Sequence, residues 1–191
     1  MRLFFALWPD ADTRERIGRM AARLQLGARA RRVPPESYHA TLAFIGEVPT
    51  SRLSALRELG AAQRATRSTI RFDGCEIWAG AQVCVLAARR APPEIIELSA
   101  RLREASPVAE HQIGEPMPLR MHVTLARKVT QASAEQAQSV IAEAGDALQR
   151  ELPLLEWAAT SFSLIRSDTR GPHSVYTVVD TWPLLYETAS E

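Results

Sequence analysis

The strongest constraint on the fold of this chain is a five-residue pattern, His-x-Thr-Leu-Ala, that occurs twice, at residues 39–43 and 122–126. Successive side chains of a β-strand point to opposite faces, so the His and the Thr of each copy would share one face. The apolar residues between and after them would pack inward on the other face. Each copy therefore predicts a strand that has an apolar back and an imidazole–hydroxyl pair on its front.

Similar secondary structure is predicted around both copies. In each half of the chain, the motif strand is followed by a helix and then by two strands around a turn. Asp12 and Glu15 have the spacing of a capping box at the start of the first helix. We expect helices at 10–26, 51–66, 92–106 and 133–152, and further strands at 2–9, 69–78, 81–88, 161–167 and 174–182.

The halves are predicted to form one unit, because no low-complexity linker separates them. We therefore expect a single domain over 1–191, with two similar lobes and an α+β fold. The composition, 46% hydrophobic and 24% charged, supplies a core without a metal or a disulfide. Cys75 and Cys84 are accordingly interpreted as buried free thiols.

The charge and the N-terminal segment limit the possible partners. A net charge of +1 excludes a protein that attracts nucleic acid as a polycation. The apolar run near the N-terminus is only six residues long, too short for a membrane span. We expect a cytoplasmic monomer that has no membrane partner.

The paired motifs suit acid–base chemistry at a phosphate. Imidazole titrates near neutrality, so His39 and His122 can serve as an acid and a base. The hydroxyls of Thr41 and Thr124 can donate hydrogen bonds to an oxyanion. No cofactor is required, and two histidines without a nearby carboxylate or third histidine make a poor metal site. The competing interpretation is a pair of ordinary half-exposed strand faces.

These residues resemble those of a known superfamily, the 2H phosphoesterases. The segments at 2–10, 31–49 and 120–129 are similar, more narrowly, to the bacterial and archaeal RNA 2′,3′-cyclic phosphodiesterases, also called 2′-5′ RNA ligases. The resemblance covers nearly the whole chain, including the strands at its end. Ala40 departs from the family pattern, in which a larger aliphatic residue is more usual, and this departure should affect packing rather than chemistry.

The resemblance implies a fold, a reaction and residue roles. Two antiparallel sheets would face a central cleft, with helices outside. The reaction would open a terminal 2′,3′-cyclic phosphate to a 2′-phosphate on RNA ends or nucleotides. His39 would protonate the departing 3′ oxygen, His122 would activate water, and Thr41 and Thr124 would hold the non-bridging oxygens. The pseudo-symmetry of the motifs leaves the exchange of acid and base open.

The same resemblance implies that Arg127 binds the substrate, under one condition. It lies five residues after His122, so a regular strand would direct it to the opposite face. The strand must end or bulge before it. By the same parity, Tyr38 and Phe44 are predicted to be core residues.

Several roles stay open on sequence grounds. His111 and His173 are predicted in a loop and a turn, and Arg32 and Arg120 are candidates to meet RNA phosphates. Ligation through a 2′-5′ bond is the reverse of the hydrolysis. Two different functions also fit the motifs: a module that binds RNA ends or cyclic nucleotides without turnover, and a related activity on another small cyclic phosphate.

Overall fold

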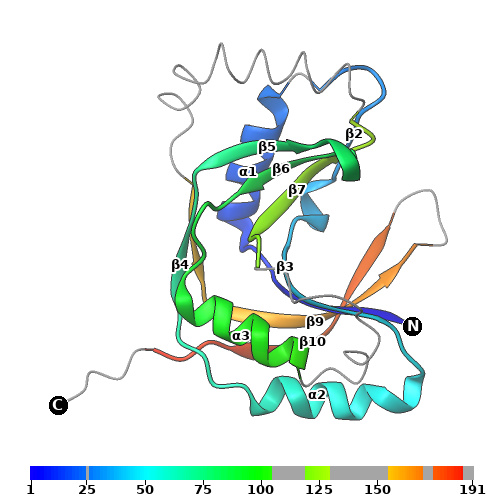
Figure 1. Cartoon of the computed structure of the whole chain (residues 1–191), viewed down its shortest axis with the longest axis vertical. Helices are drawn as coiled ribbons and strands as arrows, with labels where there is room; N and C mark the ends of the chain where they lie inside the picture. The colour runs from blue at the N-terminus through cyan, green and yellow to red at the C-terminus, as the bar shows by residue number, and fades with distance from the viewer. Residues whose placement is uncertain (25, 105–118, 130–154, 170–173, 187–191) are drawn as a thin grey trace.

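A computed structural model describes residues 1–24, 26–104, 119–129, 155–169 and 174–186. Within these residues, eight strands form one antiparallel sheet with the order β10-β9-β1-β3-β7-β6-β5, in which β2 also pairs with β7 (Figure 1). We call the strands on either side of the β3–β7 contact the first and the second arm. The first arm contains β1 (Arg2–Leu7), β3 (Ala40–Glu47), β9 (Ser161–Asp168) and β10 (Val175–Pro183). The second arm contains β2 (Arg31–Arg32), β5 (Gly74–Trp78), β6 (Val83–Ala87) and β7 (His122–Arg127).

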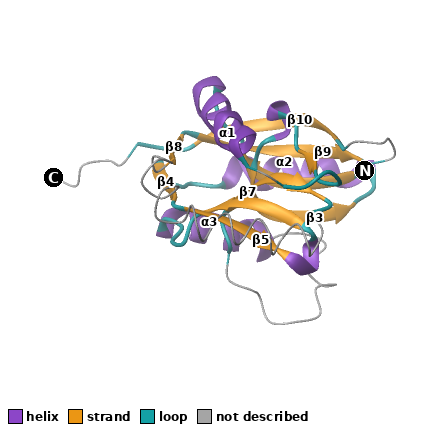
Figure 2. Cartoon of the chain, turned by 90° about the horizontal axis from the view of Figure 1, so that it is seen from above, coloured by secondary structure: helices purple, strands orange, loops and turns teal. Residues whose placement is uncertain are grey.

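Three helices pack around these strands, α1 (Ala11–Arg23), α2 (Leu53–Ala62) and α3 (Pro93–Glu104). Figure 2 shows α1 and α3 on opposite sides of the strands, and Figure 1 shows α2 beside β9 and β10. This arrangement confirms the predicted α+β class with antiparallel sheets and outer helices. No helix in the described part of the chain is long and apolar enough to cross a membrane.

Helix α1 begins with a different cap from the predicted one. The carboxylate of Asp10 accepts a hydrogen bond from the backbone N–H of Thr13 at 2.8 Å, so Asp10 is the N-cap. The capping box predicted for Asp12 and Glu15 is therefore wrong, because both residues already lie inside the first turns of the helix. The helix packs on the core through Ile17 and Ala21, which are both buried.

The strand predicted at 69–78 is two strands. Asp73 ends β4 (Ser68–Phe72), where its backbone N–H donates to the carbonyl of Ala87, and β5 begins at the next residue. Strand β4 pairs with β8 (Leu155–Ala159) in a separate two-stranded sheet, and β8 was not predicted. The ring of Phe72 stacks on that of Trp157 with centroids 5.9 Å apart, so burial of large aromatic side chains stabilises this pairing.

Other predictions are confirmed or lie outside the described residues. The thiols of Cys75 and Cys84 are free, with their sulfur atoms 3.5 Å apart across β5 and β6. Cys84 is buried as predicted, whereas Cys75 is half-buried. The helix at 133–152, His111 and His173 fall in ranges that the structure does not describe.

The two arms meet at one described residue pair. Ala40 in β3 pairs with Val123 in β7, and both side chains are fully buried. These are the central residues of the two His-x-Thr motifs. Directly paired residues share a face of a sheet, so the histidines and threonines that flank them share the opposite face. The junction of the arms thereby brings both motifs to one place.

Candidate active site

Each motif strand carries a bulge at its shared leucine. In β3, Thr41 pairs with Ala6 and Ala43 pairs with Phe5, which leaves Leu42 as an extra residue. In β7, Thr124 pairs with Val85 and Ala126 pairs with Cys84, which leaves Leu125 as an extra residue. A bulge shifts the parity of every residue beyond it. The fifth residue after each histidine, Phe44 or Arg127, therefore returns to the histidine's face.

His39 lies just before β3 in an aromatic pocket. The ring of Trp8 is stacked on its imidazole at 5.7 Å between centroids, and the rings of Phe4 and Tyr176 each lie 5.0 Å away. The Nδ1–H of His39 donates to the carbonyl oxygen of Ser37 at 2.7 Å, because a carbonyl can only accept. This bond fixes the tautomer and directs Nε2 away from the Ser37 carbonyl.

Burial is the main cause that lowers the pKa of His39, to about 4. The hydrogen bond to Ser37 opposes this shift, and the nearby positive charges of Arg127 and His122 add to it. The imidazole of His39 is therefore neutral at pH 7 in the free protein.

His122 begins β7 and is held in a parallel way. Its Nδ1–H donates to the carbonyl oxygen of Arg120, two residues earlier, at 2.6 Å. Burial lowers its pKa, and the charges of Arg120 and Arg127 lower it further, whereas the Glu76 carboxylate raises it. Both histidines thus have the same tautomer, and neither Nε2 atom has a hydrogen-bond partner among the described residues.

The polar groups beside the histidines are free to meet a ligand. Within the part of the chain that the structure describes, the hydroxyls of Thr41 and Thr124 have no hydrogen-bond partner, and Arg127 has no ion pair. A cavity of about 360 Å³ is lined by His39, Thr41, Arg127 and residues of β1, β9 and β10. His122 and Thr124 do not line this cavity but lie on β7, the strand that carries Arg127.

Arg127 and Phe44 test the parity argument in opposite ways. The condition set for Arg127 is met, because the bulge at Leu125 precedes it and its side chain reaches the cavity with His39. The prediction that Phe44 is a core residue is wrong, since its side chain is 46% exposed and lines the same cavity. The bulge at Leu42 is the physical reason. Tyr38 is buried, as predicted.

The two arginines proposed as phosphate contacts have partners in the protein. Arg32 donates to the carbonyl oxygens of Ala21 and Leu24 at the end of α1, so its role there is structural. Arg120 forms an ion pair with Glu76, at 2.7 Å between Nη2 and Oε2. The sequence did not indicate the aromatic rings around His39 or the two partners of Arg120, Glu76 and Trp78, because these residues lie far from the motifs along the chain.

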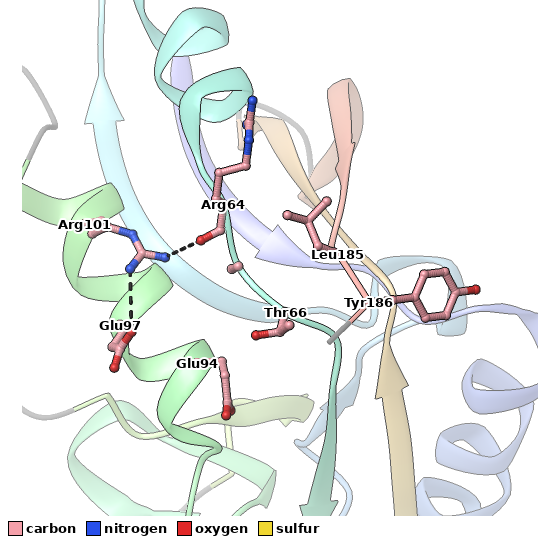
Figure 3. A pocket seen from close by; sticks show the side chains of 8 residues that line it. Arg64, Thr66, Glu94, Glu97, Arg101, Leu185 and Tyr186 are labelled. Carbon is pink, nitrogen blue, oxygen red and sulfur yellow. Dashed lines mark hydrogen bonds and ion pairs between the residues drawn. The ribbon is translucent and has the colours of Figure 1, made fainter. Parts of the chain in front are cut away.

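A larger hollow of about 510 Å³ lies elsewhere, between the end of α2, the helix α3 and the chain after β10 (Figure 3). Its Arg101 is already bound within the protein: the guanidinium donates to the backbone carbonyl of Arg64 at 3.0 Å and forms an ion pair with Glu97 at 3.7 Å. No histidine is among the described residues that line it. The smaller cavity therefore has the chemistry of the candidate site.

An antiparallel α+β fold that joins two His-x-Thr strands through their central residues is that of the 2H phosphoesterases. Comparison with known sequences assigns the family within this class. The chain belongs to the 2′-5′ RNA ligase superfamily, whose family model matches residues 8–171.

Relatives at moderate identity cover nearly the whole chain. The RNA 2′,3′-cyclic phosphodiesterase of Escherichia coli (strain K12) is 29% identical over 185 residues, 96% of each chain. The protein of the same name from Thermus thermophilus is 27% identical over 203 residues, covering 100% of this chain and 94% of the relative. The crystal structure of E. coli LigT complexed with 3′-AMP superposes with a TM-score of 0.76 at 27% identity, covering 96% and 97% of the two chains.

Proposed function

We propose that this protein hydrolyses 2′,3′-cyclic phosphates at the ends of RNA or on nucleotides, without a metal, and leaves a 2′-phosphomonoester. The observation that carries the proposal is the matched pair of imidazoles, each fixed by its Nδ1–H with Nε2 unpaired among the described residues and each followed by a threonine hydroxyl. The names of the E. coli and Thermus relatives and the 3′-AMP bound to LigT support the substrate class.

In the proposed reaction, His122 takes a proton from water as the water oxygen bonds to phosphorus. The bond from phosphorus to the 3′ oxygen breaks, and His39 gives that oxygen a proton. Thr41 and Thr124 donate hydrogen bonds to the non-bridging oxygens, and Arg127 balances their charge. The anionic cyclic phosphate raises the pKa of each neighbouring imidazole when it binds, so His39 can take up from solvent the proton that it later gives to the 3′ oxygen.

The assignment of acid and base follows the family resemblance. Exchanging the two histidines gives the same balanced reaction because the motifs are pseudo-symmetric. Ligation through a 2′-5′ bond is the same reaction run backwards, with a 5′-hydroxyl in place of water, so any site that stabilises the transition state serves both directions. We also propose that residues 1–191 fold as one unit, supported by a buried core that includes described residues of both arms. We propose in addition that the protein acts as a monomer.

Phosphorus NMR on a 2′,3′-cyclic nucleotide in excess EDTA tests the proposed function. We expect a single 2′-phosphomonoester signal, because the 3′ oxygen is the leaving group. We expect it to form in EDTA, because two imidazoles supply both proton transfers. A 3′-phosphate product, or turnover that EDTA abolishes, would contradict the mechanism. Binding of the nucleotide without turnover would indicate a binding module, and turnover of a different cyclic phosphate alone would indicate the related activity.

Phe44 is proposed as a stacking surface for the terminal base, because its exposed ring lines the cavity beside His39 and Thr41. The guanidinium of Arg2 lies 4.8 Å from the ring centroid, which holds one side of the ring in place. Base–aromatic stacking contributes about 1–3 kcal/mol, so Phe44→Ala should raise KM roughly tenfold with little change in kcat.

Steady-state kinetics on a cyclic nucleotide measure this effect. Phe44→Tyr keeps the ring and should behave as the parent protein. Ile96→Ala, which truncates an exposed apolar side chain on α3 with 44% exposure, is the matched control. An equal effect on KM from Ile96→Ala, or none from Phe44→Ala, would contradict the stacking role.

A further inference from the structure

Glu76 is at the centre of a closed group of contacts beside His122. Its Oε2 accepts a hydrogen bond from the indole Nε1–H of Trp78 at 2.7 Å and pairs with the guanidinium of Arg120 at 2.7 Å. The Arg120 guanidinium lies 4.4 Å from the centroid of the Trp78 ring. The Trp78 ring in turn lies 4.5 Å from the imidazole of His122. One carboxylate oxygen thus binds both the Trp78 ring, which contacts His122, and the Arg120 guanidinium, which lies over that ring.

The sheet register explains why these residues meet. Glu76 pairs with Val85, which pairs with Thr124, so all three share one face of the second arm. One row further along, Trp78 and Val83 lie on the same face with Arg127. The group on β5 therefore faces the same side as the proposed catalytic residues on β7.

His122 also depends on Arg120 through the backbone. The carbonyl of Arg120 accepts the Nδ1–H of His122, while the Arg120 side chain is held by Glu76. The imidazole is therefore held by a hydrogen bond to Arg120 and by a ring contact with Trp78, and the Glu76 carboxylate binds the side chains of both residues.

The two histidines differ in this respect. His39 is held by three aromatic rings, from Phe4, Trp8 and Tyr176. Among the described residues, His122 has one ring contact, with Trp78, and that ring is anchored by a charged group at the solvent edge. The position of His122 is therefore sensitive to a single substitution, whereas that of His39 rests on a packed apolar cluster.

We propose that Glu76 is a positioning residue for His122, acting through Trp78 and Arg120. This inference rests on the proposed function of His122 in proton transfer. The side chains of Glu76 and Arg120 are 38% and 57% exposed, and ion pairs at such exposure contribute little to folding stability. The contacts of Glu76 therefore serve the orientation of the imidazole more than the fold.

Glu76→Gln is the variant that tests the proposal. The glutamine keeps the shape and can still accept from Trp78, but it loses the ion pair with Arg120. We expect kcat on a 2′,3′-cyclic nucleotide to fall about tenfold, part of the 10²–10⁴ available from one proton transfer, with KM and Tm unchanged. Trp78→Phe keeps a ring beside His122 but has no indole N–H to donate to Glu76. We expect its kcat to fall less than that of Glu76→Gln.

The matched control is Glu156→Gln. Glu156 forms a similar exposed ion pair with Arg71 at 3.0 Å, between β8 and β4, where neither strand carries a histidine. This variant should retain the kcat of the parent protein. If Glu156→Gln lost as much activity as Glu76→Gln, the effect would belong to surface charge in general and the proposal would be wrong.

Two measurements separate this inference from the proposed function. NMR titration of the histidine rings needs no turnover: removing the Glu76 carboxylate should lower the pKa of His122 and leave the pKa of His39 unchanged, since the carboxylate raises the pKa of His122 alone. In a His122→Ala background, Glu76→Gln should cause no additional loss of kcat. A further tenfold loss there, or an unmoved His122 titration, would overturn the positioning role even if the hydrolysis is confirmed.

Discussion

Replacing either histidine by alanine should lower kcat for cyclic phosphate hydrolysis by about 10²–10⁴-fold, which is about 3–5 kcal/mol of barrier. Each imidazole moves a proton that alanine cannot move, and the two steps are parts of one displacement. We therefore expect the fold-loss in kcat of the variant that lacks both His39 and His122 to be smaller than the product of the two single-variant fold-losses. Initial rates with a 2′,3′-cyclic nucleotide, followed by separation of the products, measure these effects.

Asparagine at each position separates chemistry from structure. Its amide can donate to the carbonyl of Ser37 or Arg120 in place of Nδ1–H, but it cannot accept and return a proton near neutrality. His39→Asn and His122→Asn should therefore be as inactive as the alanine variants while folding as the parent protein does. Rates within tenfold of the parent protein in any of these variants would show that the imidazoles are not the acid and the base.

The threonine hydroxyls should give the next largest effect. Thr41→Val and Thr124→Val conserve the β-branched shape that suits a strand and replace the hydroxyl, with its hydrogen-bond donor, by a methyl group. Loss of one preorganised donor to a developing oxyanion costs about 10²–10³-fold in kcat, and we expect a loss near the lower figure because both threonines are half-exposed.

Serine is the informative control at these positions. Thr41→Ser and Thr124→Ser keep a hydroxyl on the same carbon and should retain most of the parent kcat. Comparison of kcat and KM for the four variants with a cyclic nucleotide checks the prediction. If valine raised KM without lowering kcat, the hydroxyls would bind the ground state and the transition state equally and would not lower the barrier from the bound complex.

The alternation of side chains along a strand predicted the His-x-Thr pairs but not the residues that follow them. The pairing of His39 with Thr41 on one face needs only three residues of regular strand, and a pattern of apolar and polar residues reveals that much. The bulge at Leu42 cannot be found in the same way, because an extra leucine in an apolar run leaves no local signal. Phe44 was misplaced for this reason, whereas Arg127 was placed only by allowing for a bulge.

The remainder of the site depends on long-range pairing. Tyr176 reaches His39 through the order of strands in the first arm, and Trp78 reaches His122 through the register of β5 and β6. Neither relation can be deduced from spacing along the chain. The Asp-Gly pair at residues 73–74 is a turn signal that indicates the break in the predicted strand. Nothing in the local sequence indicates that β4 pairs with β8.

The junction of Ala40 and Val123 fixes the distance between the two halves of the reaction centre. Because these residues are paired in neighbouring antiparallel strands, backbone hydrogen bonding holds the two motif backbones about 5 Å apart, whichever side chains stand at the two positions. Both side chains are fully buried on the back of the sheet, so a larger aliphatic residue at position 40 would change the packing of the core and not the distance between the strands. The width of the gap that receives the phosphate is therefore a property of the sheet backbone, which substitutions of these side chains leave unchanged.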